Sequence, residues 1–404
     1  MKASRRAVAA TPSLVLLRSV IVALSLALGA TSALLAGVVA RTARRVVTPA
    51  RRLADTRIVD VDVAAQTITL SRSADTALPG RYGLFTSGTT EYVKLGSVLS
   101  EDESTVTRKL LTHIGPDARL SADAAFSGWY FDDPEQLHLP YQSELVGAAV
   151  GPCPAWIFPA AEPGDTWVIQ VHGRGTTRAE CLRAVPPFHG MGVTSMLVSY
   201  RNDGSAPRSR TGTYTLGATE WRDVDAAIGV ARRRGARRVI VMGWSMGGAI
   251  ALQVALSSAH RDLIVGVILE SPVIDWRRVL SFQARQLGLP ASVAGLAITA
   301  LGSDWSAQLA GADARIPFDR LDVVARAGEL RHPVLILHSD DDGFVPSDAS
   351  HDLVLARPDL VEMQVFDTAR HAKLWNYDQD RWSAAITDWA ERHDLVGRRS
   401  KVEE

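Results

Sequence analysis

The sequence predicts an α/β protein in which helices cover both faces of a mostly parallel sheet. From about residue 141 onward, apolar runs such as Trp167–Val171 and Val239–Trp244 alternate with segments of helical spacing. Strands that are apolar on both sides are typical of parallel sheets buried between helix layers. In addition, the stretch GWSMGG stands where one apolar run gives way to a helical segment. Functional sites of parallel sheets form at such carboxyl ends of strands.

The composition is that of an ordinary globular protein without a charge bias. The chain has 404 residues, of which 47% are hydrophobic and 22% charged, which suits one large domain with additions or two domains. Lys+Arg and Asp+Glu both total 44, so no bulk electric field favours nucleic acid as a partner. Two cysteines, Cys153 and Cys181, cannot form a disulfide scaffold or supply a four-ligand zinc site. They form either one bridge in an exported domain or two buried thiols.

Residues 1–40 predict a membrane anchor. Ser19–Ala40 runs for 22 residues without a charge, and roughly 20 apolar residues are needed to cross a bilayer. A signal peptide cleaved after Ala40 is the alternative, which would release a secreted protein. Basic residues flank both ends, so the side of the membrane stays open. We expect a linker over residues 41–56.

Residues 57–140 predict a small β-rich module. Segments 57–72 and 81–100 each alternate apolar and polar residues around a turn, and 104–112 offers a further strand. These strands suit an antiparallel module whose β character ends at about Thr112. The segment contains no group of residues that suggests chemistry, so we expect a packing or spacer role.

Residues 141–395 predict the α/β domain that carries the site. An insert over about residues 276–330 separates two strands, and its apolar stretch 289–305 suits a small cap that lines an acyl pocket. The expected strands are 153–160, 166–173, 193–200, 239–244, 263–270, 333–339 and 361–367, and the expected helices are 177–190, 216–235, the segment after Ser245, and 380–393.

Ser245 is the candidate nucleophile. A serine at a sharp strand-to-helix turn is lifted clear of the sheet, and its neighbours two residues away must lack bulk. Gly243 and Gly247 occupy those two places, and Gly248 allows the helix to approach the strand.

Two backbone N–H groups are candidates for stabilising an oxyanion. The first belongs to Met246, directly after the nucleophile. The second belongs to Arg174 in the loop His172–Gly175, which follows a strand and whose glycines let its backbone fold over a reacting carbonyl. The similar stretch His189–Gly192 precedes its strand, so its glycines fit a helix C-terminus better.

A serine nucleophile needs a base and an acid that orients the base. Among ten histidines, His371 is the one that follows a late strand at the correct edge of the sheet. For the acid, Asp340, Asp341 and Asp342 stand just past a strand. Three adjacent carboxylates cannot all face one imidazole.

Together, these motifs resemble the α/β-hydrolase superfamily, whose triad occurs in the order Ser, Asp, His. In that family the acid stands four residues before the proline of a D-x-x-V-P segment, which selects Asp342. The resemblance covers roughly residues 141–393 and is closest to esterase and serine-peptidase-like branches with membrane-anchored bacterial members. It implies the α/β-hydrolase fold and a serine hydrolase that cleaves an ester, thioester or amide. The sequence contains no metal-binding cluster and no nucleotide-binding loop, so we expect no cofactor.

Two further interpretations stay open. One is a serine peptidase with the same fold and triad. The other is a membrane-tethered binding protein on a hydrolase scaffold without catalysis. The sequence leaves the natural substrate and the oligomeric state undetermined.

Overall fold

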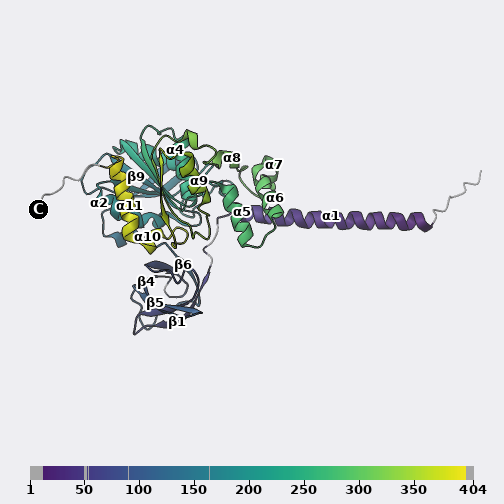
Figure 1. Cartoon of the computed structure of the whole chain (residues 1–404), viewed down its shortest axis with the longest axis horizontal. Coiled ribbons are helices and arrows are strands. Elements are labelled where there is room, and N and C mark those ends of the chain that lie inside the picture. The colour runs from purple at the N-terminus through teal and green to yellow at the C-terminus, as the bar shows by residue number, and fades with distance from the viewer. Residues whose placement is uncertain (1–11, 50–51, 53, 90, 163, 397–404) are drawn as a thin grey trace, which may run out of the picture.

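The computed structural model describes residues 12–49, 52, 54–89, 91–162 and 164–396. A long N-terminal helix projects from the body of the protein, a β-barrel lies at one side of the body, and an α/β domain forms the largest part (Figure 1). The predicted fold class is confirmed in its sheet, its helical cap, its β-rich module and its apolar N-terminal helix.

The N-terminal helix α1 (Pro12–Val47) is longer than the charge-free segment. It continues through the first half of the expected linker, because its last turns pack onto the α/β domain. Ala43 and Val47 are fully buried there, and Tyr214 donates its backbone N–H to the Val47 carbonyl over 2.7 Å. Tertiary contacts therefore decide where this helix ends.

The β-rich module is a closed barrel with the strand order β1-β2-β5-β4-β3-β6, in which neighbouring strands are antiparallel. Its strands are β1 (Thr56–Asp62), β2 (Thr67–Ser71), β3 (Tyr82–Phe85), β4 (Tyr92–Glu101), β5 (Thr105–Leu110) and β6 (Asp123–Ser127). The first five follow the alternation of the sequence. The short strand β6, which closes the barrel against β1 and β3, lies beyond the predicted end at Thr112.

The α/β domain is built on an eight-stranded sheet of order β14-β13-β12-β11-β9-β10-β8-β7. Pairing is parallel from β14 to β10 and antiparallel at β8 and β7. The strands are β7 (Gln142–Ala148), β8 (Gly151–Phe158), β9 (Thr166–Val171), β10 (Thr194–Val198), β11 (Arg238–Trp244), β12 (Ile264–Glu270), β13 (Val334–Ser339) and β14 (Val361–Phe366). The edge strand β7 was not predicted.

Helices cover both faces of this sheet and create two separate apolar cores. On one face pack α3 (Trp221–Arg233), α4 (Met246–Ser257) and α9 (Asp348–Ala356); on the other pack the 3-10 helix η2 (Arg178–Ala184), α2 (Val185–Gly190), α10 (Leu374–Tyr377) and α11 (Gln379–Arg392). Cys153 in β8 and Cys181 in η2 belong to different cores and are both free, buried thiols.

The insert between β12 and β13 is a small helical cap, as predicted. It contains α5 (Trp276–Gln286), α6 (Ala291–Gly302), α7 (Asp304–Leu309), α8 (Phe318–Leu321) and the 3-10 helix η3 (Ala327–Glu329). Helix α6 packs against α1, and Figure 1 shows α6 and α7 beside the point where α1 leaves the body.

Candidate active site

Ser245 occupies a strained turn between β11 and α4. Its φ of 52° and ψ of −116° are unusual for a residue with a side chain. A Cβ at Gly243 would lie 2.2 Å from the Gly247 carbonyl oxygen, and one at Gly247 would lie 2.1 Å from the Val171 carbonyl oxygen. Both distances are far inside van der Waals contact. Glycine is therefore required on each side of the serine, as the sequence pattern predicts.

The structure brings three of the predicted site residues into one row. His371 Nε2 lies 3.0 Å from Ser245 Oγ, and His371 Nδ1 lies 2.7 Å from Asp342 Oδ2. The three side chains come from the carboxyl ends of β11, β14 and β13, where a parallel sheet gathers its functional groups. This geometry suits transfer of the serine proton to the imidazole, with the carboxylate orienting the ring.

Asp342 is held as a buried carboxylate. Its Oδ1 accepts the backbone N–H groups of Phe344 at 2.9 Å and Val345 at 2.8 Å. Burial by itself would raise the pKa of this carboxyl group. His371 and a second histidine, His338, outweigh burial and hold the pKa of Asp342 well below its usual range. The group is therefore ionised at neutral pH.

The other two carboxylates of the run face different partners. Asp340 accepts hydrogen bonds from Ser347 and pairs with His351 at the start of α9. Asp341 pairs with Arg370 over 3.1 Å. Only Asp342 of the three reaches the imidazole of His371, so local turn geometry separates three residues of identical chemistry.

His338 supports the carboxylate, and the sequence analysis did not identify it. Its Nε2 lies 3.3 Å from Asp342 Oδ2 and 3.1 Å from the Val345 carbonyl, while its Nδ1 lies 2.8 Å from Ser350 Oγ. The ring is fully buried. Its position at the end of β13, four residues before Asp342, was a usable signal.

The predicted oxyanion loop lies against the nucleophile. A Cβ at Gly173 would lie 3.4 Å from Ser245 Cβ, and the Gly173 N–H is already donated to Glu180 Oε2 over 2.8 Å. Among the described residues, the backbone N–H groups of Arg174 and Met246 have no hydrogen-bond acceptor. Neither N–H group is therefore engaged within the described part of the protein, as the predicted role requires.

The side chain of Arg174 is used elsewhere. Its Nη2 donates to the Arg45 and Thr48 carbonyls at 2.8 Å each, which satisfies carbonyl groups left unpaired at the end of α1. Burial lowers the pKa of this guanidinium from its ordinary value. The oxyanion loop and the N-terminal helix are therefore joined through one residue.

The side chain of His172 stabilises the predicted oxyanion loop through contacts with two buried residues. Its ring stacks on Tyr200 with centroids 4.4 Å apart, and its Nε2 lies 3.1 Å from Asp203 Oδ2. Burial opposes ionisation of Asp203, but its hydrogen bond and charge attraction with His172 leave the pKa lowered. The Tyr200 hydroxyl donates to the carbonyls of His172 and Gly173. The loop thus has a fixed backbone.

A buried carboxylate stands behind the nucleophile. Glu270, at the end of β12, accepts the indole N–H groups of Trp244 at 2.7 Å and Trp382 at 2.9 Å. Its backbone carbonyl accepts the Ser245 N–H at 3.0 Å, and Arg183 lies 3.6 Å from its carboxylate. Sequence analysis missed Glu270, although a glutamate ending an apolar strand is unusual enough to notice.

Two family matches cover most of the chain. Residues 168–386 match the alpha/beta hydrolase family, which is more than half of the chain. Residues 57–127, which include the six barrel strands except the first residue of β1, match a domain of unknown function (DUF8805). No curated protein matches the sequence.

Solved structures of hydrolases resemble the protein. An esterase from Pyrococcus furiosus is 16% identical with a TM-score of 0.51, and the match covers 65% of this chain and 94% of the esterase. A monoacylglycerol lipase from Paleococcus ferrophilus is 19% identical, with coverages of 60% and 99% and a TM-score of 0.43. A puromycin-hydrolyzing peptidase from Mycobacterium tuberculosis is 18% identical, with coverages of 84% and 47% and a TM-score of 0.49. At these identities, the first match shows a shared fold.

Proposed function

Because the chain belongs to the α/β-hydrolase family, we propose that it is a serine hydrolase that cleaves an ester through an acyl-enzyme. The observation that carries this proposal is the continuous row of Ser245, His371 and Asp342 at 3.0 and 2.7 Å. Residues 141–395 would form the catalytic domain.

The first half of the reaction forms the acyl-enzyme. His371 takes the hydroxyl proton through Nε2 as the oxygen of Ser245 attacks the carbonyl carbon of the substrate. Asp342 keeps the imidazole in the required tautomer and stabilises its protonated form. The protonated His371 then gives the proton to the leaving alcohol, and in the second half the same base activates the water that releases the acid.

Charge on the substrate oxygen is stabilised by the N–H groups of Arg174 and Met246. Both are fixed by the surrounding backbone before the substrate arrives, so little reorganisation accompanies the reaction. The N-terminal end of α4 adds its partial positive charge beside Met246.

The cap is the feature that bears on the substrate class. Its apolar stretch 289–305 suits contact with a small or medium acyl group. We therefore favour an ester over an amide. Parallel assays with p-nitrophenyl esters of increasing chain length and with aminoacyl anilides would separate an esterase from a peptidase of the same fold.

Labelling with a fluorophosphonate tests the mechanism, because this probe reacts with activated serines. The wild-type protein should be labelled at Ser245, and Ser245→Ala should lose both labelling and esterase activity while keeping its thermal unfolding temperature. The matched control Ser104→Ala, in an exposed barrel turn, should retain both. A wild-type protein that folds but is never labelled would favour the non-enzymatic binding protein instead.

We also propose that the protein is retained on a membrane by α1. The described part of this helix contains one span, Leu24–Val47, that is long and apolar enough to cross a bilayer, with a mean hydropathy of 1.6. Beside it, Leu296, Trp305 and Leu309 of the cap are exposed by 46%, 75% and 66%, which suits contact with the bilayer surface. Cell fractionation of the full chain, compared with a chain beginning at residue 41, tests retention. Recovery of a soluble product that begins at residue 41, when the full chain is expressed, would favour the cleaved signal peptide.

A further inference from the structure

The loop that carries His371 depends on its surroundings for its shape. It joins β14 to α10, and Ala372 within it has a φ of +50°, a left-handed conformation that costs energy for a residue with a side chain. Inside the α/β domain the Ala372 N–H donates to Ser271 Oγ over 3.1 Å. A strained loop keeps one conformation only where its neighbours fix it, and some of those neighbours belong to the barrel.

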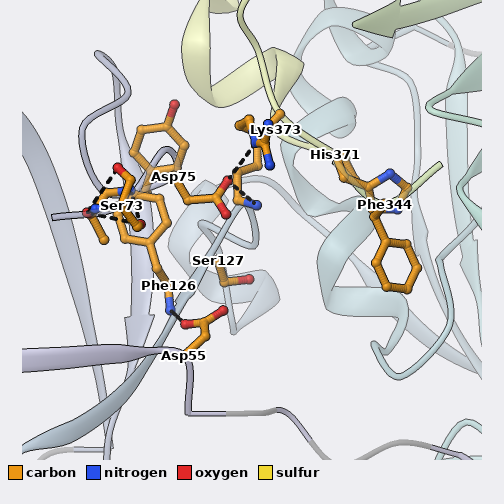
Figure 2. Close-up of polar contacts among 12 residues, drawn as sticks. Asp55, Ser73, Asp75, Phe126, Ser127, Phe344, His371 and Lys373 are labelled. Atoms are coloured by element: carbon orange, nitrogen blue, oxygen red, sulfur yellow. Dashed lines mark hydrogen bonds and ion pairs between the residues drawn. The ribbon is translucent and has the colours of Figure 1, made fainter. Parts of the chain in front are cut away.

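One barrel carboxylate reaches both sides of the catalytic histidine. Asp75, in the loop between β2 and β3, lies 3.1 Å from Lys373 Nζ and 3.7 Å from Arg370 Nε. Arg370 directly precedes His371 in the chain, and Lys373 follows it by two residues. Figure 2 shows Asp75 facing Lys373, with His371 and Phe344 on the far side of the lysine. Lys373 is only 13% exposed in its side chain, so this pair is partly shielded from solvent.

Arg370 also links Asp75 to the loop that carries the acid, Asp342. Arg370 also donates to the Asp341 backbone carbonyl at 3.0 Å and pairs with its carboxylate at 3.1 Å. Asp341 directly precedes Asp342. Asp75 of the barrel is therefore linked, through one arginine, to the loops that carry the base and the acid.

Backbone contacts reinforce the ion pairs. The Arg81 N–H donates to the Asn376 carbonyl at 3.1 Å, and Asn376 Nδ2 donates back to the Arg81 carbonyl at 2.7 Å. The approach is so close that a Cβ at Gly80 would lie 2.0 Å from the Asn376 oxygen. At the end of β6, a Cβ at Gly128 would lie 2.5 Å from the Ala372 oxygen.

The barrel presents these groups from a rigid loop. Arg108, fully buried inside the barrel, donates to the carbonyls of Thr76, Leu78 and Gly80 at 2.7–2.8 Å. A buried guanidinium requires such acceptors, so the segment that follows Asp75 is held by the interior of the barrel and not by solvent.

A second buried arginine ties the barrel to the nucleophile side of the site. Arg183 Nη1 donates to the carbonyls of Gly128 at 2.9 Å and Ala372 at 3.0 Å. Its Nη2 lies 3.6 Å from Glu270, whose backbone holds the Ser245 N–H. One guanidinium thus contacts the barrel, the histidine loop and the carboxylate behind the serine.

We propose that the barrel is a positioning module of the active site, and that Asp75 is the positioning residue through which it holds His371 at Ser245. This gives the domain of unknown function a role beyond that of a spacer. The inference rests on the proposed serine hydrolase mechanism. Asp75 touches neither the substrate nor the reacting atoms, so it acts on the rate of the chemical step and not on substrate binding.

The variant Asp75→Asn, in the full chain, removes the charge and keeps the shape. We expect kcat on a p-nitrophenyl ester to fall about tenfold with KM unchanged, because small displacements of a catalytic group reduce the rate steeply. The second-order rate of fluorophosphonate labelling should fall by the same factor. Asp75→Glu should recover much of the loss, and Lys373→Gln should reproduce it. The double variant should lose less than the product of the two single losses, since both remove one interaction.

The control is an exposed ion pair of the barrel. Glu101 pairs with Arg72 at 3.4 Å, and both side chains are exposed. Glu101→Gln should leave kcat and KM unchanged, with thermal unfolding followed for every variant. An unchanged kcat in Asp75→Asn, a loss that appears in KM alone, or an equal loss in Glu101→Gln would each overturn the positioning role. If Asp75→Asn does not fold, Lys373→Gln and the comparison with Glu101→Gln decide the question.

Failure of this inference is distinguishable from failure of the mechanism. If the wild-type enzyme is labelled at Ser245 and the Asp75→Asn variant is labelled equally fast, the serine hydrolase mechanism is supported and the positioning role of Asp75 is rejected. A wild-type protein without labelling or esterase activity rejects the mechanism, and with it the inference.

Discussion

Replacing Gly247 with alanine would separate the proposed nucleophile, Ser245, from the proposed oxyanion loop, His172–Gly175. Gly247 lies in the first turn of α4, where its Cα faces the end of β9. An added Cβ would lie 2.1 Å from the Val171 carbonyl oxygen and 2.5 Å from that of His172. Both atoms are backbone, so neither can rotate away as a side chain would.

The size of the effect follows from these distances. Real Cβ contacts essentially never fall below 3.0 Å, so α4 and β9 must separate by about 0.9 Å. A misplacement of about 1 Å reduces catalysis by about 100-fold, which corresponds to about 2.7 kcal/mol in the activation barrier. The strain should also lower the free energy of unfolding by about 1–3 kcal/mol.

The assay compares kcat/KM for a p-nitrophenyl ester with the rate of fluorophosphonate labelling and with thermal unfolding. We expect both rates to fall together, since the elbow and the oxyanion hole move apart. Gly147→Ala is the matched control, because a Cβ there meets nothing within 4 Å and the residue lies on the edge strand β7. If Gly247→Ala keeps kcat/KM within twofold of the wild type at an unchanged unfolding temperature, the reasoning about the elbow is wrong.

Further predictions concern Asp342, the two cysteines and Val47. Asp342→Asn should lower kcat about 10⁴-fold in steady-state kinetics, because the imidazole loses its orienting acceptor. The pKa of Asp342 is lowered by folding, so its contribution to stability is complete above the unfolded pKa of about 3.9 and is lost as pH falls further. The stability difference between the wild type and Asp342→Asn in urea titrations should therefore shrink from pH 5 to pH 3, and a growing difference would contradict the assignment. Burial raises the pKa of the Cys153 thiol to about 12, and Cys181 is equally buried, so a thiol reagent should label both only after unfolding. Val47→Asp should lower the free energy of unfolding by about 3 kcal/mol, because it buries an unpaired charge where α1 docks; an unchanged unfolding temperature would show that the docking does not persist.

Local patterns carried most of the fold prediction. The strands of the parallel sheet are continuous apolar runs, and the first five barrel strands alternate with a period of two, so each was visible in its own segment. The edge strand β7 and the closing strand β6 lacked such a pattern. The closing strand β6 is defined by its pairing with the distant strands β1 and β3, which no local period reports. The edge strand β7 pairs with its neighbour β8, and Val146 is its one buried residue, so it shows no apolar alternation.

The residues of the candidate site also divide into those that a local sequence pattern indicates and those that it does not. The sequence by itself determined the elbow at Ser245, because a strand, two spaced glycines and a helix are contiguous in the chain. It also placed His371 and the run of aspartates at the carboxyl ends of strands. The family pattern, and then the turn geometry, distinguished Asp342 from its neighbours.

Only the tertiary structure decided how these groups are supported. Glu270 behind Ser245 and Asp75 of the barrel beside the histidine loop are brought in from separate segments by chain packing, and the turn after β13 places His338 against Asp342. Periodicity and spacing describe what a residue meets within a few positions of itself. A carboxylate that lies almost 300 residues before its lysine partner leaves no trace of the pair in either segment, because the contact exists only in the folded protein.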